Sequence, residues 1–130
     1  MLVVDASVLV VALADDGVDG DRSRARLAGE VLAAPEVLDL EVLSVLRRLV
    51  ATGEMPARRA SLAVEDLATL PLQRAPHTPL LGRCWELRGN VTSYDAAHVA
   101  LAEALGCVLL TADSRLASAP GPQCVVELVT

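Results

Sequence analysis

The chain opens with Met1-Leu2-Val3-Val4-Asp5-Ala6-Ser7-Val8-Leu9, an apolar run that one aspartate interrupts and that then resumes to Leu13. A strand covered on both faces of a parallel sheet shows continuous apolar residues, so Leu2 to Val4 is predicted to be a buried strand. Asp5 then lies at its carboxyl end, where open α/β sheets bind ligands. The alternative is that Asp5 only caps the following helix, because Asp is a common capping residue.

Short apolar segments alternate with amphipathic ones along the rest of the chain, which predicts a single α/β domain over residues 1–130. We expect a three-layer α/β/α sandwich with a mainly parallel central sheet of four to five strands. Pro71 places one strand at an edge of the sheet. Residues 15–20 are rich in Asp and Gly and are predicted to form a loop. Further strands are expected at 31–34, 70–75, 107–110 and 125–129, and helices at 7–14, from Asp21, and at 36–51, 56–69, 78–89, 92–105 and 114–117.

The composition limits the chemistry that this chain can perform. Its net charge is −6 and it has no Lys, so bulk attraction to nucleic acid and lysine-based chemistry are not expected. The three cysteines have no metal-ligand spacing and are predicted to be buried thiols in a reducing cytosol. We see neither a signal peptide nor a membrane-spanning run, which favours a cytoplasmic protein. Trp85 and Tyr94 are expected in the core.

Three further carboxylates are expected to lie near the crevice beside Asp5. Asp113 follows the strand at 107–110, Asp95 lies in the first turn of the helix behind Thr92, and Glu41 lies at the edge of the apolar face of the helix at 36–51. Each has a structural alternative: Asp113 as a cap, Asp95 as a partner of the helix dipole, and Glu41 as a partner of Arg48. Together they would repel one another unless cations neutralise them, and oxygen ligands suit Mg²⁺ or Mn²⁺.

Other polar side chains have simpler interpretations. His98 lies in the middle of an apolar helix face and is interpreted as a partly buried histidine rather than a catalytic base. Arginines could follow an RNA backbone or could be solvated helix faces. They are Arg22, Arg24, Arg26, Arg47, Arg48, Arg58 and Arg59.

Four sequence segments, taken in order, resemble the motifs of PIN-domain ribonucleases, and most of all those of the VapC toxins of type II toxin–antitoxin pairs. They are Val4-Asp5-Ala6-Ser7, Glu41-Val42 with Leu46-Arg47-Arg48, Tyr94-Asp95-Ala96 with Ala100-Leu101-Ala102, and Thr111 with Asp113 and Leu116. The resemblance covers the whole chain. One position departs from it, because Ser44 stands where relatives often have Asn.

The resemblance implies RNA cleavage by water that Mg²⁺ or Mn²⁺ activates. It also implies a homodimer and a small cognate antitoxin. The implied metal ligands and catalytic residues are Asp5, Glu41, Asp95 and Asp113, with Ser7 and Thr111 as supporting hydroxyls and Arg47 and Arg48 as RNA-binding residues.

Other functions remain to be separated from this one. A PIN fold retained only for binding would lack metal-dependent cleavage, and a PIN nuclease of RNA processing would lack an antitoxin. Aspartyl-phosphate phosphatases have a second Asp two residues after the first, but here that residue is Ser7. They and phosphorylated receiver domains also need a Lys, which this chain lacks.

Overall fold

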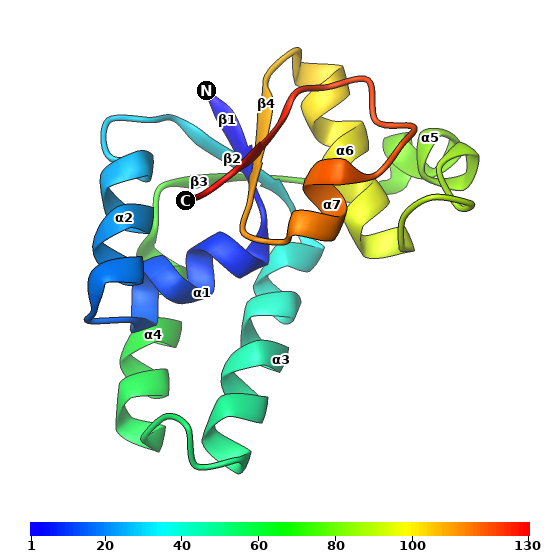
Figure 1. Ribbon diagram of the computed structural model, residues 1–130. Coiled ribbons are helices and arrows are strands. Elements are labelled where there is room, and N and C mark those ends of the chain that lie inside the picture. The colour runs from blue at the N-terminus through cyan, green and yellow to red at the C-terminus, as the bar shows by residue number, and fades with distance from the viewer.

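The computed structural model describes residues 1–130 as three layers, with a parallel sheet between two groups of helices (Figure 1). The sheet order is β3-β2-β1-β4-β5, and every pair of neighbouring strands is parallel. The predicted α/β fold with a mainly parallel sheet is confirmed, and β3 is an edge strand as expected. The strands are β1 Leu2–Val4, β2 Leu32–Pro35, β3 Leu72–Ala75, β4 Val108–Thr111 and β5 Val126–Leu128.

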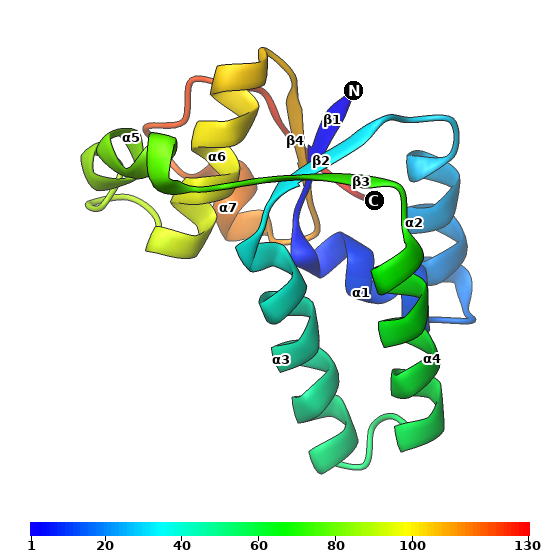
Figure 2. The ribbon, with the colours of Figure 1, turned by 180° about the vertical axis from the view of Figure 1, so that it is seen from behind.

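Two groups of helices cover the two faces of this sheet (Figures 1 and 2). The hairpin formed by α3 and α4 projects away from the sheet, with its connecting loop at the far tip. One group consists of α1 Ala6–Ala14, α2 Val18–Leu27, α3 Val37–Ala51 and α4 Ala57–Thr69; the other consists of the 3₁₀ turn η1 Thr78–Leu80, α5 Leu81–Glu86, α6 Ser93–Leu105 and α7 Ser114–Ser118.

Alternate residues of the first strand serve two separate apolar cores. Leu2 and Val4 pack in the cluster beneath α1, α3 and α4, whereas Val3 packs in the cluster beneath α6 and α7. All three side chains are at most 1% exposed. Successive strand residues point to opposite faces, so both covered faces require apolar residues. The strand is therefore fixed at the centre of the sheet, and its carboxyl end is fixed with it.

An ion pair between α5 and α6 anchors the helices of the second face. Arg83 Nε lies 2.7 Å from Glu103 Oε1, and Arg83 Nη2 lies 3.1 Å from Glu103 Oε2. The Gln123 N–H also donates to Glu103 Oε2, at 2.8 Å. The hydrogen bond from Arg83 is the main cause that lowers the pKa of Glu103, although burial opposes it. Glu103 is thus a carboxylate whose countercharge comes from the chain itself.

Helix α2 and strand β2 depart from their predicted boundaries. Helix α2 begins at Val18 rather than Asp21, so the last part of the expected loop is helical. Position 20 inside this helix requires a glycine, because a Cβ there would lie 1.8 Å from the carbonyl oxygen of Asp15. Pro35 belongs to β2 instead of ending it, since β1 pairs only with Leu32 and Ala33 and requires no N–H from Pro35.

The helix expected at 78–89 is a 3₁₀ turn followed by a short helix that ends at Glu86. The aromatic side chains were also misplaced, because Trp85 is 68% and Tyr94 is 60% exposed. The cysteines are free, as expected, but only partly buried. None of the helices combines the length and apolar character that a bilayer crossing requires.

Candidate active site

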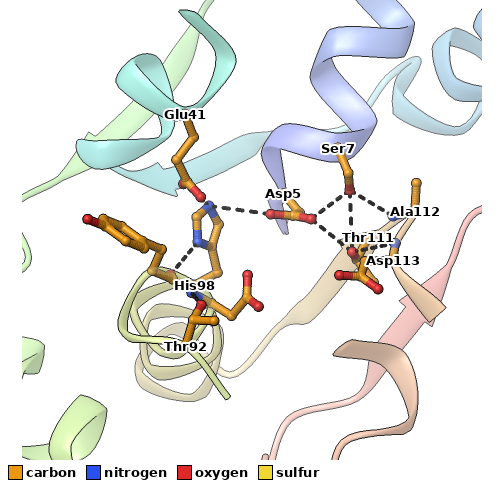
Figure 3. A network of polar contacts seen from close by, with 10 residues as sticks. Asp5, Ser7, Glu41, Thr92, His98, Thr111, Ala112 and Asp113 are labelled. Atoms are coloured by element: carbon orange, nitrogen blue, oxygen red, sulfur yellow. Dashed lines mark hydrogen bonds and ion pairs between the residues drawn. The ribbon is translucent and has the colours of Figure 1, made fainter. Parts of the chain in front are cut away.

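Asp5 leaves the end of β1 with its carboxylate buried at the sheet edge (Figure 3). Its backbone N–H donates to the carbonyl of Leu110 at 2.9 Å, which continues the pairing between β1 and β4. Its side chain makes no capping hydrogen bond to α1, so the capping alternative is wrong. Instead, Asp5 Oδ2 accepts hydrogen bonds from Ser7 Oγ at 2.6 Å and from Thr111 Oγ1 at 2.9 Å. These contacts fix one oxygen and leave Oδ1 facing the opposite side.

The two hydroxyls also hold the backbone at the end of β4. Ser7 Oγ accepts a hydrogen bond from the Ala112 N–H at 3.0 Å, and Thr111 Oγ1 accepts one from the Asp113 N–H at 3.0 Å. Each hydroxyl therefore donates to Asp5 while it accepts from the turn that follows β4. This network joins the ends of two neighbouring strands, so Ser7 and Thr111 lie beside the carboxylates as expected.

Asp113 follows β4 and caps the short helix α7. Its Oδ1 accepts a hydrogen bond from the Arg115 N–H at 2.9 Å and lies 3.5 Å from Arg115 Nε. The capping alternative is therefore correct for this residue. The cap occupies one carboxylate oxygen, and the side chain retains 32% exposure beside the Asp5 network. Capping fixes the position of Asp113 without excluding a second role for its other oxygen.

Asp95 lies in the first turn of α6, where its N–H donates to Thr92 Oγ1 at 3.1 Å. The predicted capping arrangement is thus present. Burial is the main cause that raises the pKa of the Asp95 carboxyl, and the charges of Asp5 and Asp113 raise it further. Asp95 therefore interacts electrostatically with both Asp5 and Asp113. The hydrogen bond with Thr92 and the charge of His98 partly oppose this rise of its pKa.

Glu41 projects from α3 toward the same cluster. Its Oε1 lies 3.5 Å from His98 Nε2, and no ion pair joins it to Arg48. The alternative that Glu41 pairs with Arg48 is therefore wrong. Burial raises the pKa of Glu41, His98 partly lowers it, and the charges of Asp5 and Asp95 raise it again. The four carboxylates chosen from the sequence thus influence one another electrostatically.

His98 is the residue of this cluster whose place the sequence reasoning missed. It is completely buried, not partly buried, and its ring lies between Glu41 and Asp5 (Figure 3). Nδ1 is 2.9 Å from the carbonyl oxygen of Tyr94, and Nε2 is 4.0 Å from Asp5 Oδ1. One sequence signal was available, because residues three apart share a helix face and His98 is three residues after Asp95.

The donor atoms of Asp5, Glu41 and His98 all lie within 4.8 Å of one another. Glu41 Oε1 and His98 Nε2 are buried and have no hydrogen-bond partner. Buried polar atoms normally find partners, and neighbouring carboxylates normally find a countercharge. Both requirements are met by a divalent cation, and the carboxylate and imidazole donors suit such an ion.

A cleft of about 500 Å³ opens beside the carboxylates. Asp95 and Asp113 line it together with Arg88 and Arg115. The Arg88 guanidinium lies 4.6 Å from the centre of the Trp85 ring, and its Nη1 donates to the Trp85 carbonyl at 2.9 Å. The cleft therefore combines acidic groups with two exposed arginines that the sequence reasoning did not select.

The arginines that were selected divide into two groups. Arg24 donates to the carbonyls of Ala12 and Asp15, and Arg26 pairs with Glu30 and Glu127, so these contacts hold both guanidiniums against the protein surface. Arg22 and Arg59 also lie near aspartates, at 4.0 and 2.8 Å. The second group consists of the selected arginines that are exposed and have no ion pair, and these are Arg47, Arg48 and Arg58.

Comparison with known proteins matches a PIN domain model to residues 2–122. The chain is 47% identical over 128 residues to Ribonuclease VapC1 of Mycobacterium tuberculosis (strain ATCC 25618 / H37Rv), which covers 98% of this chain and 96% of that relative. It is 41% identical over 129 residues to VapC ribonuclease Mb0985 of Mycobacterium bovis, covering 99% and 98%. The crystal structure of PAE2754 from Pyrobaculum aerophilum matches with a TM-score of 0.70 at 26% identity, over 98% of this chain and 83% of that chain. The matched regions include every carboxylate of the site.

Proposed function

The chain belongs to the PIN-domain family, and we propose that it is a VapC-type endoribonuclease, the toxin of a type II toxin–antitoxin pair. Relatives named as ribonucleases match it along nearly its full length, at 36–47% identity. The observation that carries the proposal is the acidic cluster beside the carboxyl ends of β1 and β4, in which Asp5 is buried and Glu41, Asp95 and Asp113 are partly buried. The Ser7 and Thr111 hydroxyls fix one oxygen of Asp5. On the other side of Asp5 lie two buried atoms without a hydrogen-bond partner, Glu41 Oε1 and His98 Nε2.

In this proposal Asp5, Glu41, Asp95 and Asp113 hold Mg²⁺ or Mn²⁺. Such an ion, when bound, supplies positive charge next to the scissile phosphate and makes a water more acidic. Ser7 and Thr111 orient Asp5, because both hydroxyls donate to the same carboxylate oxygen. Ser44 is exposed on α3, so the carboxylate cluster does not depend on a side-chain amide at that position.

RNA is proposed to approach through the cleft that Asp95 and Asp113 line. Arg88 and Arg115 stand in that cleft, and guanidinium groups pair with phosphate oxygens in a bidentate manner. Arg47 and Arg48 are exposed on α3 beyond Glu41 and could bind the same strand further along. These arginines give an acidic protein a local basic path to an acidic site.

The proposed partners are a small antitoxin and a second copy of the chain. An antitoxin that placed an Arg among the carboxylates would replace the positive charge of the metal and would block RNA at the same time. Its basic residues can be changed singly while binding and inhibition are measured. If all such variants inhibit fully, the antitoxin acts by covering the cleft instead.

We also propose that the protein acts in the cytoplasm.

Metal-dependent cleavage tests the function directly. Purified protein is incubated with end-labelled RNA in EDTA and then with increasing Mg²⁺ or Mn²⁺. We expect discrete cleavage products only with the metal. RNA binding without cleavage at any metal concentration would instead support a PIN fold that serves only for binding. Cleavage without any neighbouring antitoxin gene would favour a nuclease of RNA processing.

A further inference from the structure

His98 is a buried imidazole that an all-carboxylate metal site leaves without a role. Its side chain is 0% exposed, yet Nε2 has no hydrogen-bond partner. A buried polar atom without a partner destabilises the folded protein, so such atoms normally have a hydrogen-bond partner or bind an ion. The atom points toward Asp5 and Glu41, whose carboxylate oxygens lie 4.0 and 3.5 Å away (Figure 3). These separations are too long for hydrogen bonds.

The other ring nitrogen determines what Nε2 can do. Nδ1 lies 2.9 Å from the carbonyl oxygen of Tyr94, one helical turn earlier in α6. A carbonyl can only accept, so Nδ1 carries the proton in the neutral ring and Nε2 presents a lone pair. That lone pair faces the lone pairs of two carboxylates, which is unfavourable without a cation between them. An imidazole that donates through one nitrogen to a backbone carbonyl is also the usual arrangement of a histidine metal ligand.

The spacing of the donors leaves room for an ion. Ligand atoms about 2.1 Å from a small divalent cation stand about 3 Å apart when adjacent and about 4.2 Å apart when opposite. The separations of Nε2 from Glu41 Oε1 and Asp5 Oδ1, at 3.5 and 4.0 Å, fall in this range. The second oxygen of Asp5 is already held by Ser7 and Thr111, so Oδ1 is directed to the same space.

We propose that His98 binds the divalent cation through Nε2, together with Asp5 and Glu41, and that the site therefore prefers Mn²⁺ to Mg²⁺. Mg²⁺ strongly favours oxygen ligands, whereas imidazole nitrogen favours transition metals, among which Mn²⁺ also accepts carboxylates. This inference rests on the metal site of the proposed function and specifies its ligands. The competing arrangement is a protonated His98 that forms ion pairs with Asp5 and Glu41.

Pulsed electron paramagnetic resonance of the Mn²⁺-loaded protein tests the ligand without reference to activity. The chain contains only two histidines, and His77 is exposed. We expect a directly bound nitrogen coupling that changes when histidine alone is labelled with ¹⁵N. The coupling should persist in the matched control His77→Gln and disappear in His98→Gln. Bound Mn²⁺ without histidine nitrogen coupling in the wild-type protein would overturn the proposal and favour the ion pair.

Calorimetric titration then tests the preference between metals. We expect the wild-type protein and His77→Gln to bind Mn²⁺ more tightly than Mg²⁺. In His98→Gln, the Kd for Mn²⁺ should rise about tenfold or more, while that for Mg²⁺ rises less. An equal rise for both ions, or no rise, would contradict the stated preference. If His98→Gln fails to fold, His98→Asn serves as the second variant, and the wild-type spectrum still decides the ligand.

The two proposals can fail separately. Histidine nitrogen coupling in a protein that cleaves no RNA would refute the ribonuclease function and leave His98 as a metal ligand. Metal-dependent cleavage in a protein whose Mn²⁺ spectrum lacks that coupling would keep the function and refute the ligand.

Discussion

This protein has partly buried carboxylates in two places, and their pKa values are shifted in opposite directions. The pKa of Glu103 lies below its ordinary value, chiefly because Arg83 donates to both of its oxygens. The pKa values of Glu41 and Asp95 lie above theirs, chiefly because of burial and then because of neighbouring charges. Glu103 has its countercharge within the chain and stabilises the fold. In the acidic cluster no Arg pairs with Asp5, Glu41 or Asp95, and the proposed function assigns their countercharge to a bound metal ion.

The largest expected effect comes from removing a charge of the cluster. Asp5→Asn should reduce RNA cleavage at least about a hundredfold, because it removes a proposed ligand whose other oxygen is already fixed. Asp113→Asn should have the same effect. Glu103→Gln is the matched control, since it neutralises a partly buried carboxylate away from the site and should cleave at the wild-type rate. Full cleavage by Asp5→Asn, in cleanly prepared protein, would rule out a metal-ligand role for that residue.

Metal binding should next separate the two regions by stability. At a Mn²⁺ concentration of a hundred times the Kd of the wild-type protein, the free energy of unfolding of that protein should rise by about 2.7 kcal/mol. The variants are compared at the same Mn²⁺ concentration. Glu103→Gln should gain as much, from a lower starting stability, whereas Asp5→Asn should gain less. Thermal unfolding with and without Mn²⁺ measures these gains. An equal gain in all three proteins would mean that the ion binds elsewhere.

Loss of the structural ion pair should cost stability without metal. Glu103→Gln should lower the free energy of unfolding by about 2 kcal/mol at pH 7, because Arg83 and the Gln123 N–H lose a charged acceptor. The folded pKa of Glu103 is lowered, so this contribution is present above the ordinary carboxyl value of 4.5 and is lost as the pH falls through the folded value. Urea unfolding from pH 7 to pH 3 should show the two proteins converging in acid. A constant difference would contradict the charge-based explanation.

The smallest expected effect has the opposite sign. Glu41→Gln should raise the stability of the metal-free protein by about 1 kcal/mol at pH 7, because it removes a charge that burial and the neighbouring carboxylates disfavour. The folded pKa of Glu41 is raised, so the wild-type protein loses stability as the pH rises from 4.5 through the folded value. The gain should therefore vanish toward pH 4.5. If unfolding experiments show that Glu41→Gln is less stable at pH 7, the contact between Glu41 and His98 is a stabilising ion pair.

Local sequence patterns predicted the sheet because its strands are short, and the central strands β1 and β4 are apolar runs that end at an aspartate or just before one. Gly106 ends α6 in the left-handed conformation, with φ 63°, as its place after Leu105 predicts. The start of α2 could not be predicted in this way, because Gly20 is required by contact with the Asp15 carbonyl rather than by a turn. That contact exists only once α1 and α2 pack together.

The carboxylates of the site were accessible to the sequence because two of them follow strands and one begins a helix. His98 was passed over although it lies three residues after Asp95, because an apolar neighbourhood favours a histidine that packs in the core. Its proposed role depends on which ring nitrogen faces Tyr94 and on how far α3 lies from α6. Trp85 and Tyr94 were misplaced because a large apolar side chain favours the core, whereas Trp85 lies in the short helix α5 and Tyr94 in the exposed first turn of α6.

The hydrogen bond from Thr111 to Asp5 spans 106 positions of the chain and has a consequence for synthesis. The first strand leaves the ribosome early, but the strand that completes its carboxyl edge is made much later. Contacts this distant in sequence form late in folding. A nascent chain that stops before residue 111 therefore has Asp5 and Ser7 without the hydroxyl of Thr111 and without Asp113. If the cluster is the active site, an unfinished chain is harmless to the RNA of the ribosome that makes it.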